Sequence, residues 1–225
     1  MNKRILAAVL IAGTALFITA AFVSAKTPVE SFSFPVSSEE SRTIQMNSHE
    51  TERGPDMVDL DVFVKAVTTG DAEKVTGLYA PGVGHYYVIQ QTAGNDSRVS
   101  PVDSVLTQFR RPSSGGVIGL LAHNFAAGKN FDRFNVNDTV YLIYGNGAIH
   151  TYRVTGFLRY QAVDRNNPSS NLIDLQTGKT QSANSVYQRV YSGLPHLVLQ
   201  TCLADGDDLK WGRLFILAEK AEGRN

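Results

Sequence analysis

The sequence predicts a mainly β domain, built from many short strands in series as in a barrel or a sandwich. The 225 residues include 9 Tyr, 11 Phe and 19 Gly, a composition that suits strands joined by tight turns. Short apolar runs recur along the second half of the chain and are separated by turns rich in Gly, Asn and Asp. We find no internal repeat, so one domain with a substantial core is expected.

The first 25 residues have the features of a secretory leader. A basic start, Met1-Asn2-Lys3-Arg4, precedes a run from Ile5 to Val23 that carries no charged residue. Val23-Ser24-Ala25 then resembles a small-residue cleavage site. The run is long for a signal core and borderline for a spanning helix, which needs roughly 20 residues. Residues 1–25 are therefore either a signal peptide or an N-terminal membrane anchor, and either one exports the remainder.

Residues 26–56 are rich in Ser, Thr and Glu and contain few large apolar side chains, which predicts a flexible polar stalk. His49 lies in this stalk, and we expect no role for it. Residues 57–225 then form the folded domain. Its expected location is extracytoplasmic, either anchored to the membrane by an uncleaved leader or secreted after cleavage.

The clearest helical pattern lies between Met57 and Ala80. Apolar residues recur there at helical spacing, namely Val58, Val62, Phe63, Ala66 and Val67. Gly70-Asp71 interrupts the pattern, and Asp71 is a candidate cap for a second short helix over Ala72–Tyr79. We expect a short N-terminal helical segment that packs on a sheet, although the same pattern also suits a different α+β fold.

From Val83 onward the pattern predicts strands. The strongest support is for a hairpin in which Val140–Tyr144 and Ile149–Leu158 flank the turn Gly145-Asn146-Gly147. Further strands are expected at Tyr86–Gln91, near Val105, at Val117–Ala122, at Tyr160–Val163, at Leu172–Leu175 and at Ser185–Tyr191. Turns or loops are expected at Asn124–Asn130, Arg165–Asn171 and Thr177-Gly178.

The last two predicted strands surround the only cysteine of the chain. The apolar run Leu197–Thr201 leads directly into Cys202, Ala204–Asp208 predicts a turn, and Leu214–Ala218 predicts the returning strand. Since the ends of a hairpin nearest its loop face each other, Cys202 and Arg213 should lie on neighbouring strands. A lone thiol beside a cation is a candidate nucleophile next to a charge stabiliser.

Cys202 has two possible interpretations at this point. Free cysteines are often small buried hydrophobes with no chemical role. An exported chain with one cysteine, however, cannot form an internal disulfide, and its thiol is at risk of oxidation outside the cytoplasm. A purely structural cysteine could be replaced there by Ala or Val, so the functional interpretation gains weight.

A cysteine nucleophile needs a proton-transfer partner, and histidine is the usual one. Of the five histidines, His85 opens a strand and His150 lies in the hairpin, where exposed positions with no role are expected. His196 is close in sequence, but six residues of strand span roughly 20 Å. His123 ends an apolar strand as Cys202 does, where sites are commonly built. It is the best candidate, and a loop histidine without a role is the alternative.

The charge balance argues against one class of partner. Lys and Arg together number 21, as do Asp and Glu, so the formal net charge is zero. This balance argues against nucleic acid as a partner and gives no reason to expect binding to an anionic membrane surface.

Three segments surround the candidate site residues: Leu120-Leu121-Ala122-His123-Asn124, Val198-Leu199-Gln200-Thr201-Cys202 and Trp211-Gly212-Arg213-Leu214-Phe215. They resemble motifs of the sortase family, the cysteine transpeptidases of bacterial surfaces. The family's usual Thr-Leu-x-Thr-Cys has Val198 here in place of the first Thr, and Ala122 replaces the usual Gly before the histidine. Neither difference touches a reacting group, and both bear on the subclass. The resemblance covers most of Val83–Glu219, and the leader, the stalk and the scarcity of cysteine also fit.

The resemblance implies a closed β-barrel of about eight strands, with Asn130–Val190 carrying its middle strands and a loop over the site. It also implies that Cys202 attacks a C-terminal sorting signal of another exported protein and forms a thioester. His123 would act as general acid and base, and Arg213 would stabilise the oxyanion or bind the substrate backbone. An amine acceptor at the cell envelope, or water, would resolve the thioester.

No cofactor is expected. The calcium site of some sortases cannot be placed, because no acidic cluster has convincing ligand spacing, and calcium dependence stays open. Two other cysteine-enzyme families fit less well. The Ser-His-Gly…Cys arrangement of L,D-transpeptidases is absent, and papain-like enzymes place the cysteine early, on a helix, before the histidine. The non-enzymatic alternative is an exported β-barrel binding module that keeps the sortase shape with an unused site. The sequence does not reveal the sorting motif, the acceptor, the subclass, whether the leader is cleaved, the oligomeric state, or whether the enzyme anchors, polymerises or hydrolyses its substrates.

Overall fold

The computed structural model describes residues 58–95, 97–113 and 115–221. The expected leader at residues 1–25 and stalk at residues 26–56 lie outside the described residues, as does His49. Within the described ranges, no helix is both long enough and apolar enough to span a membrane.

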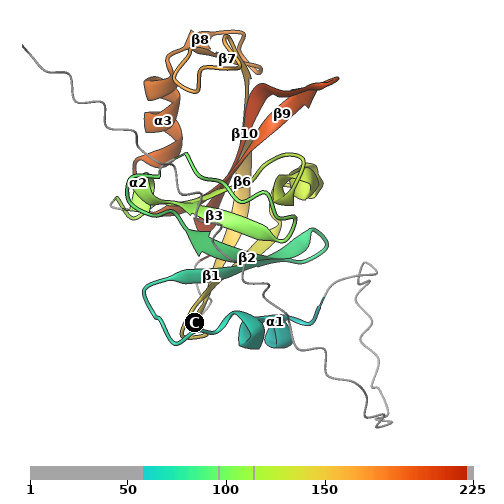
Figure 1. Cartoon of the computed structure of the whole chain (residues 1–225), viewed down its shortest axis with the longest axis vertical. Helices are drawn as coiled ribbons and strands as arrows, with labels where there is room; N and C mark the ends of the chain where they lie inside the picture. Colours follow the sequence, from blue (N-terminus) through green and yellow to red (C-terminus); the bar gives the residue numbers. More distant parts are fainter. Residues whose placement is uncertain (1–57, 96, 114, 222–225) are drawn as a thin grey trace, which may run out of the picture. The chain divides into compact units, whose positions relative to one another are not determined.

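The described part of the chain is mainly β, as the composition predicts (Figure 1). The strands are β1 (Val75–Ala80), β2 (Gly84–Gln90), β3 (Val105–Phe109), β4 (Ile118–Leu121), β5 (Thr139–Tyr144), β6 (Ile149–Ala162), β7 (Leu172–Asp174), β8 (Thr180–Gln181), β9 (His196–Asp205) and β10 (Asp208–Lys220). The helices are α1 (Leu60–Val67), α2 (Arg110–Ser113), the 3₁₀ helix η1 (Ala127–Arg133) and α3 (Ala183–Tyr191).

Eight of these strands close into a barrel. Their hydrogen-bonded order is β10-β9-β4-β3-β2-β1-β5-β6, and β6 pairs with β10 to complete the ring. The pairs β2–β3 and β4–β9 are parallel, whereas the other pairs in the ring are antiparallel. Strands β7 and β8 extend the sheet from β6 and stay outside the ring. The expected closed barrel of about eight strands is confirmed for the described residues.

Alternation along the strands gives the barrel an aliphatic interior. Its most buried side chains are at most 1% exposed and include Leu78, Leu106, Leu120, Leu142, Leu197, Leu199 and Ile216. Burying each such side chain stabilises the fold by about 1.5–3 kcal/mol. Because successive side chains of a strand point to opposite faces, Val198 and Phe215 face outward. There they pack with Val186 and Tyr191 of α3, so α3 covers the outer face of β9 and β10.

The N-terminal helix is confirmed, but the second predicted helix over Ala72–Tyr79 is wrong. The residues from Val75 form β1, which pairs with β2 on one edge and β5 on the other. Gly77 lies directly under α1, since a Cβ there would approach Val67 Cγ2 to 3.0 Å. Asp71 accepts the backbone N–H of Glu73 in a turn. Pairing on both edges and the close approach of α1 override the local helical pattern.

The strand predicted at Ser185–Tyr191 is also wrong, because this segment lies in α3. The Ser182 hydroxyl accepts the backbone N–H of Ser185 at 3.1 Å and caps the helix N-terminus. Val186, Val190 and Tyr191 are buried at helical spacing against the outer face of the barrel. The β-branched and aromatic composition suggested a strand, but the cap and the 3.6-residue period were the better signals.

The two predicted hairpins are present with altered limits. Strands β5 and β6 pair as expected, and β6 runs without a break to Ala162. Strand β9 extends to Asp205 and β10 begins at Asp208, so the turn is shorter than predicted. Cys202 therefore lies inside β9, and its position is fixed by backbone pairing instead of by a loop.

Candidate functional site

Cys202 and Arg213 lie opposite each other on paired strands. The antiparallel register of β9 and β10 pairs Cys202 with Arg213 and Gln200 with Phe215. Thr201, between Gln200 and Cys202, is 4% exposed and faces the other side of the sheet. Because side chains alternate along a strand, Gln200 and Cys202 share the outer face, and Arg213 and Phe215 share it across the pairing.

His123 reaches the same face from the other side of β9. Strand β4 runs parallel to β9, with Leu120 opposite Leu199 and Leu121 opposite Gln200. The pairing continues past the end of β4, since the backbone N–H of Ala122 donates to the Gln200 carbonyl at 3.0 Å. Extending this register by two residues brings His123 opposite Cys202. We call His123, which directly follows β4, together with Cys202 of β9 and Arg213 of β10, the pocket row.

The pocket row lines one cavity of about 630 Å³. Its floor is the preceding row of the same three strands, Leu121, Gln200 and Phe215. One wall is α3, through Val186, Tyr187 and Tyr191, and another is the loop that carries Arg165, Asn166 and Pro168. These walls come from the segment that the family resemblance assigns to the loop over the site. Burial raises the pKa of the Tyr191 phenol, which stays neutral and donates to Gln200 Oε1 at 2.5 Å.

The segment after β4 positions His123 through one contact to its ring and several hydrogen bonds of the backbone and of Asn124. The His123 ring stacks on Phe125 with centroids 4.8 Å apart and planes 12° apart. The His123 carbonyl accepts the backbone N–H groups of Ala126 and Gly128, at 3.0 and 2.9 Å. The Asn124 side-chain amide donates to the Leu209 carbonyl at 2.9 Å and ties the loop to β10. The sequence predicted a loop over Asn124–Asn130, and the structure has instead a hydrogen-bonded turn over residues 124–126 followed by η1 from Ala127.

Gly128 is a site residue that the sequence analysis missed. A Cβ at this position would lie 2.3 Å from Thr201 Oγ1 and 2.9 Å from the His123 carbonyl oxygen. Real Cβ atoms do not approach so closely, so the loop rests on β9 only because residue 128 has no side chain. The only sequence signal for it was a glycine a few residues after the candidate histidine, which can mark a close approach of two backbone segments.

The Arg213 guanidinium is positioned by backbone groups of its own strand. Arg213 Nη1 donates to the carbonyls of Gly212, at 2.8 Å, and Lys210, at 3.2 Å. The register between β9 and β10 shifts between Asp208 and Gly212, directly before Arg213. Since a guanidinium has five N–H donors, others are left for a ligand in the pocket.

Among the described histidines, His123 alone lines the cavity that contains Cys202. His85 packs edge-on against Phe63 beneath α1. His150 lies beside Tyr144, and burial together with the Lys220 charge lowers its pKa. His196 contacts the carbonyls of Leu194 and Val190, each at 2.8 Å, and lines a different cavity. The three predicted site residues are thus brought together, and these three other histidines are not part of the group.

Neither reacting group of the pocket row is engaged elsewhere in the described part of the chain. No hydrogen bond there involves the Cys202 thiol or the His123 ring, and Cys202 is half-buried. The described residues also contain no group of three or more His, Cys, Asp and Glu side chains that could hold a metal ion. What the arrangement offers chemically is a thiol, an imidazole and a guanidinium on one cavity wall.

Several solved structures are similar to this chain. A lid mutant of sortase A from Corynebacterium diphtheriae is 14% identical, with a TM-score of 0.44 over 66% of this chain and 70% of that one. A Clostridium perfringens sortase D5 transpeptidase is 11% identical, with a TM-score of 0.44 over 73% of this chain and 90% of that one. Sortase C-1 from Actinomyces oris is 12% identical, with a TM-score of 0.45 over 75% of this chain and 83% of that one. No protein-family model and no curated protein sequence matches the chain. These likenesses concern backbone shape and assign no role to any residue of the pocket.

Proposed function

We propose that the chain is a sortase-type cysteine transpeptidase of exported proteins, with Cys202 as its nucleophile. The observation that carries this proposal is the pocket row, in which His123 after β4, Cys202 of β9 and Arg213 of β10 line one cavity. Nucleophilic catalysis by cysteine needs a base or acid within reach and a donor for the developing negative charge. The row supplies these three components and no other described histidine lines the cavity.

In the proposed reaction, the Cys202 thiolate attacks the carbonyl carbon of a substrate peptide bond. The oxyanion that forms accepts N–H groups of Arg213 that are not bound to the Lys210 and Gly212 carbonyls. As the C–N bond breaks, imidazolium His123 gives its proton to the leaving amine, and a thioester remains on Cys202. An incoming amine then attacks the thioester and gives a proton to neutral His123, and the thiolate leaves. Water in place of the amine gives hydrolysis.

The cavity also supports a peptide substrate with an apolar side chain. Leu121 and Phe215 in the floor and Val186 and Tyr187 in the wall are apolar or aromatic, and they line the same cavity as the reacting thiol. Together with the sequence motifs, this supports the C-terminal sorting signal of an exported protein as the acyl donor. The amine acceptor would belong to the cell envelope.

The domain assignment belongs to the same proposal. Residues 1–25 would place the chain outside the cytoplasm as a signal peptide or an anchor, residues 26–56 would be the stalk, and residues 57–225 the catalytic domain.

The proposal is tested by trapping the acyl-enzyme. The full chain is incubated with a pool of C-terminal peptides from exported proteins, and its intact mass is followed with and without triglycine as acceptor. We expect an adduct on Cys202 that hydroxylamine removes, as a thioester requires, and that triglycine turns into a transpeptidation product. Cys202→Ala is the control and should form no adduct. A hydroxylamine-resistant adduct, or a thiol that reacts only after denaturation, would contradict the proposal and favour a non-catalytic binding module.

A further inference from the structure

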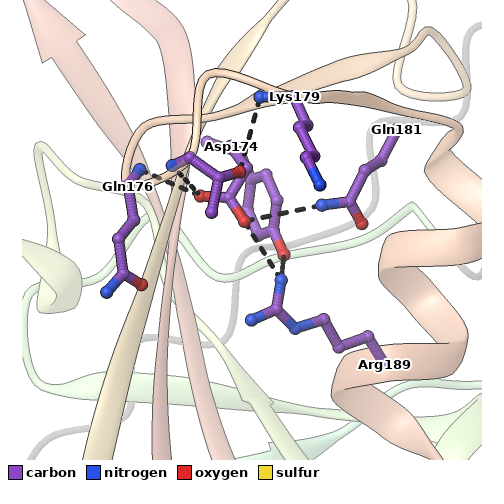
Figure 2. Close-up of polar contacts among 7 residues, drawn as sticks. Asp174, Gln176, Lys179, Gln181 and Arg189 are labelled. Carbon is purple, nitrogen blue, oxygen red and sulfur yellow. Dashed lines mark hydrogen bonds and ion pairs between the residues drawn. The ribbon is translucent and has the colours of Figure 1, made fainter.

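A second group of polar side chains lies next to the pocket row, on β7, β6 and α3. Asp174 ends β7 and is only 4% exposed, although it carries a carboxylate. Its Oδ1 accepts the backbone N–H groups of Gln176, at 2.9 Å, and Thr177, at 3.2 Å, which shapes the turn into β8. Its Oδ2 accepts from Arg189 Nη1 of α3 at 3.1 Å (Figure 2). One buried carboxylate therefore joins the β7–β8 turn to the helix.

Arg189 connects the helix to the barrel as well. The same Nη1 atom donates to the hydroxyl of Tyr160, a fully buried residue of β6, at 3.1 Å. We call the side chains of Tyr160, Asp174 and Arg189 the α3 clamp. Burial would raise the pKa of Asp174, but the hydrogen bonds from the Gln176 and Thr177 backbone and from Arg189 outweigh it and hold that pKa below its usual value. The clamp is thus an ion pair at ordinary pH.

The α3 clamp is in register with the pocket row. Asp174 pairs with Tyr160 across β7 and β6, Tyr160 pairs with Arg213 across β6 and β10, and Arg213 pairs with Cys202. Neighbouring strands are about 4.8 Å apart, so Tyr160 lies two strands from the thiol, at roughly 10 Å. The clamp is therefore close enough to the cavity for a movement of its side chains to change the shape of the cavity.

Helix α3 depends on such side-chain contacts for its position. It forms one wall of the cavity through Val186, Tyr187 and Tyr191, and no strand pairing fixes it. Its apolar face packs on the barrel, and such apolar contacts are less directional than a charge-assisted hydrogen bond. A directional ion pair at Arg189, on the same helix, restricts such movement.

We propose that the α3 clamp is a positioning device that sets the α3 wall of the cavity and thereby the affinity for the apolar part of the substrate. The effect on substrate rests on the proposed function, while the effect on the helix does not. Asp174, Tyr160 and Arg189 take no part in bond making or breaking. The clamp contributes to recognition, and the pocket row to chemistry.

The test compares Arg189→Met, which keeps an unbranched apolar stem and removes the guanidinium donors, with the wild-type full chain. Arg159→Met is the matched control, because Arg159 is an exposed arginine of β6 that contacts Phe157 and lies outside the clamp. Hydrogen exchange reports the helix. The cavity is reported by two alkylating probes with the same reactive group, iodoacetamide and N-benzyl iodoacetamide, whose rates with Cys202 are followed by intact mass. Tyr160→Phe, which removes one hydroxyl and no charge, serves if Arg189→Met does not fold.

We expect Arg189→Met to raise hydrogen exchange in residues 183–191. We also expect the ratio of the N-benzyl iodoacetamide rate to the iodoacetamide rate to fall by about threefold or more, because the benzyl ring of the probe loses its contact with the α3 wall. The iodoacetamide rate should stay within about twofold of wild type, since the clamp does not contact the thiol. Arg159→Met should change neither readout. Exchange and ratio equal to those of Arg159→Met would overturn the proposal, as would an equal loss of both rates. If the native wild-type thiol reacts with neither probe, the proposed function fails together with the effect on the cavity. Exchange in α3 then still decides whether the clamp holds the helix.

Discussion

The pocket row and the strand residues of the α3 clamp lie at one register position of neighbouring strands, but their polar groups differ in how they are hydrogen-bonded. In the clamp, the Asp174 carboxylate accepts from the Gln176 and Thr177 backbone and from Arg189, which also binds Tyr160. In the pocket row, the thiol and the imidazole have no hydrogen bond within the described residues. Polar groups that satisfy one another hold elements together, whereas groups left unpaired in a cavity remain for a ligand. The contrast predicts that clamp variants lose structure and pocket-row variants lose reaction.

The largest effect is expected for His123→Ala. Removing the proton-transfer group should lower the rate of acyl transfer by about 10²–10⁴-fold. Because the ring has no polar partner in the described structure and loses only its stacking on Phe125, the free energy of unfolding should fall by about 0.5–1.5 kcal/mol. Turnover and urea unfolding of the full chain measure the two quantities. His150→Ala, at a half-buried histidine outside the cavity, is the control and should leave turnover unchanged; a large loss there would contradict the assignment.

A smaller loss is expected for Gly128→Ala, which places a methyl group between the His123 loop and β9. The new Cβ would meet Thr201 Oγ1 at 2.3 Å and the His123 carbonyl oxygen at 2.9 Å, so the loop must move. Overpacking of this kind costs about 1–3 kcal/mol, and we expect activity to fall by about 10–100-fold. Gly156→Ala is the matched control, since a Cβ there has no atom within 4 Å. Equal activity of the two variants would show that the loop does not need to rest on β9.

Phe125→Ala should have a modest effect on the pocket row. Phe125 is 55% exposed and stacks on the His123 ring, so it restrains the imidazole without filling the core. Such aromatic contacts are worth about 0.5–1.5 kcal/mol, which corresponds to a loss of about two- to tenfold in activity. Turnover at several pH values measures the loss, and Phe125→Tyr should retain activity because the ring remains. If Phe125→Tyr is as impaired as Phe125→Ala, stacking is not the reason.

The last prediction concerns stability and has the smallest expected effect on catalysis. It is the titration of Asp174 in the α3 clamp by acid. The pKa of Asp174 lies below its usual value of 3.8 in the folded chain. A depressed carboxyl pKa stabilises the fold above the unfolded-state pKa, and this contribution is lost as the pH falls through the folded-state pKa. The difference in urea midpoint between wild type and Asp174→Asn should therefore be constant above about pH 5. It should become progressively smaller as the pH falls below about 4. A gap that persists unchanged at pH 2 would mean that the charge of Asp174 is not the source of its stabilisation.

The comparison also shows which features local sequence can predict. The hairpins β5–β6 and β9–β10 follow from apolar runs of strand length and from the turn residues between them, so the pairing of Cys202 with Arg213 could be predicted from the sequence. Strand β1 was missed because pairing on both edges with β2 and β5 is nonlocal. Helix α3 was missed because β-branched and aromatic residues outweighed the Ser182 cap and the helical period.

The site was predictable only in part, for the same reason. The place of His123 beside Cys202 depends on the parallel pairing of β4 with β9, two segments far apart in sequence. Residue types and family motifs selected His123, but no local pattern predicts that pairing. The α3 clamp joins residues 160, 174 and 189 from three elements, and the last of these, α3, was expected to be a strand. For Gly128, the sequence shows only a glycine a few residues after His123, and the need for it becomes clear from the atoms that a Cβ would meet, Thr201 Oγ1 and the His123 carbonyl oxygen.

The central claim is that Cys202 and His123 act as one unit, and the pH dependence of Cys202 alkylation tests it most directly. The full wild-type chain and His123→Ala are treated with iodoacetamide across the pH range, and the rates are read from intact mass, which is unambiguous because the chain has one cysteine. We expect the native thiol to react and its pH profile to shift when His123 is removed. Identical profiles for the two proteins, or a thiol that reacts only after denaturation, would contradict the account.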